Sequence, residues 1–101
     1  MGDQIMREVA EMLTTEVADP RLASVTVSGV RMNPDLSVAE VLYTVGPEGD
    51  RDEAEKALAK AAGFLRGKLG RRLKSKFVPE LRFAHDEYLE DVIYGQKPPG
   101  H

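Results

Sequence analysis

Six apolar residues recur at steps of three and four in the second half of the chain. They are Ala54, Leu58, Ala61, Leu65, Leu69 and Leu73. This spacing predicts a helix with one buried stripe. At about 100° per residue, the opposite side of that helix carries Lys56, Lys60, Gly63, Gly67, Arg71 and Lys74. The rest of the chain must therefore supply a layer on which the leucines pack, and it must leave the cationic side open.

The same stretch concentrates positive charge. Positions 56 to 76 hold eight cations and no acidic residue, although the whole chain of 101 residues has a formal net charge of −3. The eight are Lys56, Lys60, Arg66, Lys68, Arg71, Arg72, Lys74 and Lys76. A polyanion responds to the local field of such a patch more than to the net charge. The patch predicts contact with phosphates, and an ordinary solvated helix face is the alternative interpretation.

Three glycines, Gly63, Gly67 and Gly70, fall inside the basic stretch. Each destabilises a helix interior by about 1 kcal/mol relative to alanine. We expect the helix to bend near Gly63, and a third helical piece of the chain to run from there to about Leu73. Glycines on the solvent side also permit close approach of a partner to the backbone.

The N-terminal half predicts a helix followed by a hairpin. Asp3 is placed to cap the helix, and the helix must stop by position 18 or 19 because Pro20 follows. Residues 24–32 and 37–45 have the composition of strands. Their pattern predicts a β-bulge at Ser28–Gly29 and a turn at residues 33–35. Four residues share one face of the second strand: Ala39, Val41, Tyr43 and Val45.

Past the hairpin, Asp50 and Glu53 form a capping box that starts the basic helix. Residues 74–77 read as a linker and residues 78–85 as a last strand. Pro79 confines that strand to a sheet edge, or to pairing that begins after it. Residues 86–94 predict one short helix.

The predicted fold class is α+β, with helices on one face of a three-stranded sheet. We expect one domain over residues 1–94 and a disordered tail over residues 95–101. There is no cysteine, and no apolar run approaches the roughly 20 residues of a membrane span. With no signal-peptide pattern, we expect a cytoplasmic protein.

Other sites have weaker support. Gly67-Lys68-Leu69-Gly70 spells the GxxG loop with which KH domains grip single-stranded nucleic acid, but a loop there would remove Leu69 from the helical stripe. The acidic face of the first helix, together with the acidic start of the second, suggests a protein–protein adaptor as a third class. His85 lies beside Asp86, yet two histidines without cysteine predict no metal site. No grouping meets the needs of nucleophilic or acid–base catalysis, so we expect no enzyme and no cofactor.

Short motifs in a fixed order add a resemblance. They are Asp19-Pro20-Arg21-Leu22, Val25-Thr26-Val27, Pro34-Asp35-Leu36, Ala61-Ala62-Gly63-Phe64, Leu69-Gly70 with Arg72-Leu73, Val78-Pro79-Glu80-Leu81 with Phe83, and Asp86-Glu87 with Leu89-Glu90. Together they resemble the ribosome-binding factor A family, bacterial factors that assist maturation of the small ribosomal subunit. The motifs span nearly the whole chain.

The resemblance implies a type II KH-like fold in the order α-β-β-α-kink-α-β, with Ala61, Ala62 and Gly63 as the Ala-x-Gly interhelical kink. It implies a non-enzymatic monomer that binds the free 30S subunit and its 16S rRNA. It also implies a part in processing the 5′ end of that RNA and in growth in the cold. Carried onto this chain, the RNA-facing residues are Gly63, Gly67 and the eight cations named above.

Overall fold

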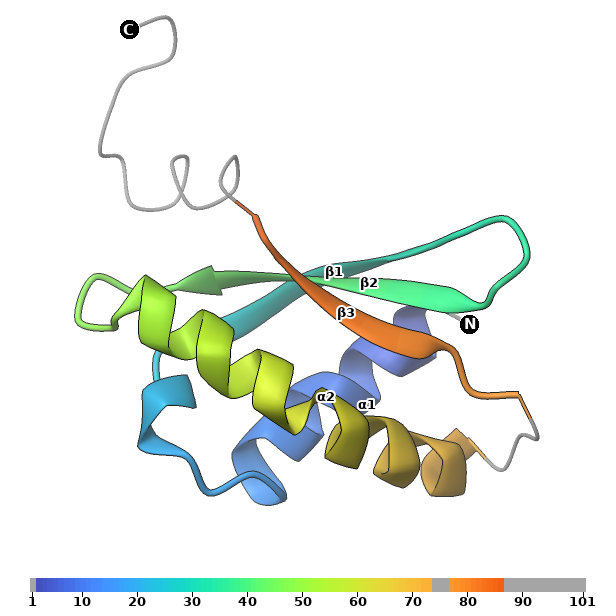
Figure 1. Ribbon diagram of the computed structural model, residues 1–101, viewed down its shortest axis with the longest axis horizontal. Helices are drawn as coiled ribbons and strands as arrows, with labels where there is room; N and C mark the ends of the chain where they lie inside the picture. Colours follow the sequence, from blue (N-terminus) through green and yellow to red (C-terminus); the bar gives the residue numbers. More distant parts are fainter. Residues whose placement is uncertain (1, 74–76, 87–101) are drawn as a thin grey trace, which may run out of the picture.

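A computed structural model describes residues 2–73 and 77–86 of the chain. Its elements are α1 (Gly2–Thr15), the 3₁₀-helix η1 (Pro20–Leu22), β1 (Val25–Met32), β2 (Val38–Val45), α2 (Arg51–Leu73) and β3 (Glu80–His85). Figure 1 shows both α-helices on the same face of the sheet. The predicted α+β class is therefore confirmed. None of these described helices is long and apolar enough to cross a membrane.

The sheet is mixed, with strand order β1-β2-β3. The first two strands form the expected antiparallel hairpin, and their register shifts between Val27 and Gly29, which confirms the bulge. The turn is closed by a bond in which the Leu36 N–H donates to the Asn33 carbonyl at 3.0 Å. Leu36 itself has a φ of 62°, in the left-handed region. The hairpin thus follows the local sequence signals closely.

The third strand lies at a sheet edge and runs parallel to β2. It begins at Glu80, directly after Pro79, and the Glu80 N–H donates to the Ser37 carbonyl at 2.8 Å. The strand therefore lies at a sheet edge and also begins its pairing after Pro79, so both alternatives expected for this proline are observed. The physical reason is that proline has no N–H to donate to the hydrogen bonds between strands. A parallel pair needs a long crossover, and α2 provides it.

The core lies between the sheet and the two helices. It contains all four predicted face residues of β2 and the main apolar positions of both helices. Its most buried members are Ile5, Val9, Met12, Ala39, Val41, Tyr43, Ala54, Leu58, Leu65 and Leu69. The stripe predicted for α2 is therefore the one that packs on the core. Its remaining two members, Ala61 and Leu73, are half-buried against it.

The connection between α1 and β1 is held by its own side chains. Asp19 caps η1 by accepting a bond from the Arg21 N–H at 2.9 Å, and it also accepts from Arg21 Nη2 at 2.8 Å. These bonds lower the pKa of Asp19 from 3.8 to about 2, with the side-chain bond from Arg21 as the largest cause. The Asp-Pro-Arg motif is thus a self-contained cap.

Helix starts and breaks differ in part from the prediction. The Asp50 carboxylate accepts a bond from the Glu53 N–H at 3.1 Å, which confirms Asp50 as the cap of α2. Asp3 lies inside the first turn of α1 instead of capping it, so that prediction is wrong. The negative charge of Asp3 still lies where the helix dipole favours it.

The separate helical piece predicted after Gly63 is not observed, because α2 runs continuously from Arg51 to Leu73, through Ala61, Ala62 and Gly63. Leu58 and Leu65 are fully buried on either side of Gly63. Their packing holds one helix against the core and overrides the low helix propensity of glycine. The linker positions 74–76, the helix predicted at 86–94 (except Asp86) and the tail at 95–101 lie outside the described residues.

Candidate nucleic-acid interface

One face of α2 is a line of cations and glycines, which we call the α2 stripe: Lys56, Lys60, Gly63, Gly67 and Arg71. All five residues are exposed. They recur at steps of three and four, so they lie on one side of the helix, opposite the buried leucines. Of the predicted solvent side, only Lys74 lies outside the described residues. The stripe presents positive charge at both ends and bare backbone between.

The two glycines of the stripe have no packing role. A Cβ added at Gly63 or at Gly67 would meet no atom within 4 Å. Gly70 differs, because a Cβ there would come within 3.0 Å of the Val78 side chain. Close packing therefore accounts for Gly70 but not for Gly63 or Gly67. At Gly63 and Gly67 the helix backbone is therefore accessible to a binding partner.

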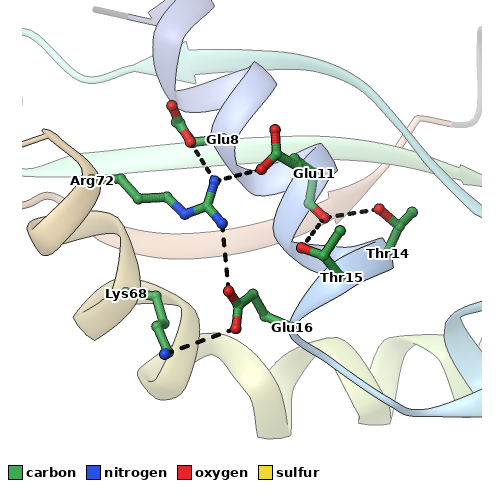
Figure 2. Close-up of polar contacts among 7 residues, drawn as sticks. All are labelled: Glu8, Glu11, Thr14, Thr15, Glu16, Lys68 and Arg72. Atoms are coloured by element: carbon green, nitrogen blue, oxygen red, sulfur yellow. Dashed lines mark hydrogen bonds and ion pairs between the residues drawn. The ribbon is translucent and has the colours of Figure 1, made fainter.

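Arg72 is placed differently from its prediction as an RNA-facing cation. Its Nη1 donates to Glu8 Oε1 and to Glu11 Oε1, each at 2.8 Å, and its Nη2 lies 3.5 Å from Glu16 Oε1. Figure 2 shows the three carboxylates of the α1 region converging on the guanidinium. These bonds raise the pKa of Arg72, those from Glu11 and Glu8 being the main causes. Arg72 therefore fastens α1 to α2.

Lys68 belongs to the same cluster, since its Nζ lies 3.8 Å from Glu16 Oε2. The cluster also occupies acidic residues that the adaptor hypothesis requires to be free. Local spacing alone places Glu8 and Glu11 on the solvent side of a helix. The cation that pairs with Glu8 and Glu11 is determined by how α1 and α2 pack together. Local sequence spacing does not predict that packing.

The other described cations of the basic stretch differ in how many polar partners they have within the protein. Arg66 donates to the Val78 carbonyl at 3.0 Å and so connects α2 to the segment before β3. A carbonyl carries no net charge, so this bond does not neutralise the guanidinium. Lys56 lies 3.6 Å from Glu53 at an exposed site, where such a pair contributes little. Lys60 and Arg71 form no ion pair with any described residue. Lys74 and Lys76 lie outside the described residues.

The Gly67–Gly70 segment is helical throughout, and Leu69 is fully buried. It cannot act as a GxxG loop without unpacking that leucine. Over residues 2–73 and 77–86, no three His, Asp or Glu side chains are grouped to hold a metal ion. His85 packs edge-on against Tyr43, with ring centroids 5.5 Å apart. The stripe is therefore the surface best suited to a ligand, and the ligand it suits is an extended anion.

The element order, the mixed sheet and the helices on one face define a KH-like α+β protein. Its long second helix carries an exposed cationic face. The chain belongs to the ribosome-binding factor A family, whose family model matches residues 1–97.

Individual relatives agree with this membership. Ribosome-binding factor A of Thioalkalivibrio sulfidiphilus is 45% identical over 91 residues, which covers 89% of this chain and 70% of the relative. The crystal structure of the Thermus thermophilus factor superposes with a TM-score of 0.76 at 29% identity, covering 96% of this chain and 94% of the other. A homology model of the T. thermophilus factor, fitted into a cryo-EM map of a 30S–RbfA complex, gives a TM-score of 0.71 at 32% identity. That match covers 82% of this chain and 88% of the other.

Proposed function

We propose that this protein is a non-enzymatic assembly factor that docks on the free 30S ribosomal subunit and contacts 16S rRNA through the α2 stripe. The observation that carries the proposal is the stripe itself, because exposed glycines flanked by unpaired cations suit the close approach of a phosphate backbone. Family membership supports the choice of the ribosome as partner. A relative of the same fold has been fitted into a map of its 30S complex.

The finer parts of the proposal follow from the family resemblance. They are a role in maturation of the subunit and in processing of the 16S rRNA 5′ end, action as a cytoplasmic monomer, and importance for growth in the cold. Of the predicted RNA-facing residues, we retain the α2 stripe and Arg66, and we also retain Lys74 and Lys76. We assign Lys68 and Arg72 to the cluster between the helices instead. Phosphate contacts fix position on the RNA, and their energy depends strongly on salt.

Co-sedimentation with purified 30S subunits tests the stripe. The double reversal Lys60→Glu with Arg71→Glu should abolish pelleting with subunits, since it replaces the two unpaired cations with charges that repel phosphate. It should leave the thermal midpoint nearly unchanged, because both side chains are exposed. A reversed protein that still pellets with subunits would show that the stripe is not the docking surface.

The sheet offers a control for net charge, whose two cations lie in exposed ion pairs, Arg31 with Glu40 and Arg82 with Glu80. Arg31 and Arg82 flank Glu40 in the strand register and are also exposed. They belong to the register positions between the helix-facing residues Ala39 and Val41, so they lie on the other face of the sheet. The double reversal Arg31→Glu with Arg82→Glu changes the net charge equally, and it should leave docking intact. Short single-stranded oligonucleotides serve as a second comparison, since a GxxG-type binder would hold them tightly and a docking factor would not.

A further inference from the structure

A cavity opens beside the α2 stripe, between that helix and the connection from α1 to η1. Its volume is about 270 Å³. The residues that line it are Glu16, Val17, Ala18, Asp19, Ala57, Lys60, Ala61 and Phe64. Lys60 belongs both to this cavity and to the stripe. A chain of nucleotides that follows the stripe would therefore pass the mouth of the cavity.

The aromatic ring of Phe64 forms one wall of the apolar part of the cavity. Phe64 is 49% exposed, although large apolar side chains on a helix surface are usually covered. Its ring also lies under the Lys68 ammonium, which is 5.6 Å from the ring centroid. Ala57 and Ala61 lie one to two turns before the ring on the same helix, and their small side chains leave room beside it. This wall is suited to the face of a flat ring.

The polar part of the cavity is made of hydrogen-bond acceptors. Glu16 lies 3.5 Å from Arg72 and 3.8 Å from Lys68, too far for strong hydrogen bonds, so its carboxylate keeps acceptor capacity. Asp19 is held by Arg21, and each oxygen of an ionised carboxylate has more than one acceptor site. Two carboxylates disfavour an anionic group inside the cavity, while Lys60 favours one at its edge.

We propose that the cavity receives a single unstacked nucleobase of the bound RNA, which stacks on Phe64 and donates from its exocyclic amino group to Glu16 or Asp19. The phosphate of the same nucleotide then lies at Lys60. This inference rests on the proposed function, since it requires RNA along the stripe. Adenine, guanine and cytosine carry an exocyclic amino group, whereas uracil can donate only from its ring N3–H. The cavity should therefore bind uracil more weakly than the other three bases.

Mononucleotides test this assignment without the ribosome. In amide ¹H–¹⁵N spectra of the full chain, AMP, GMP and CMP should shift Ala57, Lys60, Ala61 and Phe64 at millimolar concentrations. UMP should bind several-fold more weakly. Absence of shifts at the cavity, or equal affinity for UMP, would overturn the proposal.

Variants at the aromatic wall separate stacking from simple bulk. Phe64→Leu keeps an apolar side chain and should lose the mononucleotide shifts, whereas Phe64→Tyr should retain them. Phe77→Ala removes a ring that is 85% exposed and does not line the cavity, so it should behave as wild type. Retention of the shifts in Phe64→Leu would contradict stacking.

Subunit binding distinguishes failure of this inference from failure of the proposed function. Loss of one stacked base should weaken docking by roughly five- to a hundred-and-sixtyfold in Phe64→Ala. If reversal of the stripe abolishes docking while Phe64→Ala leaves it unchanged, the cavity assignment fails and the proposed function stands. If Phe64→Ala weakens docking but no mononucleotide binds, the cavity contacts protein, and the base assignment is wrong.

Discussion

Some charged residues of this protein form ion pairs that stabilise the fold, and others are exposed without such a pair. Residue type alone does not predict to which group a residue belongs. Arg71 and Arg72 are adjacent arginines in the last turn of α2. Arg71 is exposed and has no ion pair with a described residue, whereas Arg72 bonds to Glu8 and Glu11 at 2.8 Å. Adjacent helix positions point about 100° apart, so one faces solvent and the other faces α1.

Arg72→Ala should therefore lower the thermal midpoint by several degrees, because three carboxylates lose their shared counter-charge. Arg71→Ala should leave the midpoint unchanged and should weaken docking on 30S subunits. Differential scanning calorimetry at low salt measures the first effect and co-sedimentation the second. Equal midpoints for the two variants would mean that the cluster in Figure 2 does not stabilise the fold.

Asp19 gives the fold an acid-sensitive contact. Its folded-state pKa of about 2 is below its ordinary value of 3.8, so its contribution to stability is complete above that ordinary value. The contribution is lost as the pH falls from about 4 towards 2. Urea midpoints should show Asp19→Ala less stable than wild type at pH 7, with a smaller gap at pH 2.5. A gap that stays constant over this range would contradict the linkage.

At the scale of the element, α2 combines a well-packed inner face with an outer face that is poorly suited to a helix. Leu58, Leu65 and Leu69 are fully buried, so the inner face is ordinary core. The outer face contains Gly63 and Gly67, where an added Cβ would meet no atom within 4 Å. Each destabilises the helix by about 1 kcal/mol relative to alanine. A fold with no outside partner would gain from alanine at both positions.

Gly63→Ala and Gly67→Ala should each raise the thermal midpoint, by up to about 4–8 °C for a gain near 1 kcal/mol. Both should weaken docking, because a methyl group then stands where the proposed interface brings in the RNA backbone. Gly70→Ala is the matched control. Its Cβ would come within 3.0 Å of Val78, so it should gain less stability or lose some. If Gly63→Ala docks as well as wild type, that glycine is merely tolerated.

At the scale of the whole molecule, the charge distribution sets the conditions for binding. The chain carries a net charge of −3, so under the proposed function the attraction to RNA depends on the local field of the stripe and not on the total charge. The acids of α1 and of the segment after it hold Arg72 and Lys68, which narrows the cationic surface to one side of α2. Binding that depends on so narrow a surface should be steeply sensitive to salt.

The logarithm of the 30S binding constant should fall linearly with the logarithm of salt concentration. Lys60→Ala and Arg71→Ala should each reduce that slope by about one, since each removes one of the proposed phosphate contacts. Filter binding or light scattering across a salt series measures the slope. Arg72→Met should leave the slope unchanged, and a reduced slope there would return Arg72 to the interface.

The sequence by itself determined the elements of this protein, because helical spacing, strand alternation, the bulge at Ser28–Gly29 and the cap at Asp50 are local signals. It also placed Leu58, Leu65 and Leu69 on one face of α2 and Lys60 and Arg71 on the other. Only the tertiary structure decided that β3 runs parallel to β2, that α2 is continuous at Gly63, and that Arg72 meets Glu8 and Glu11. These outcomes depend on contacts between residues that are far apart in the chain. Packing around the shared core determines those contacts, and a local sequence pattern contains no information about them.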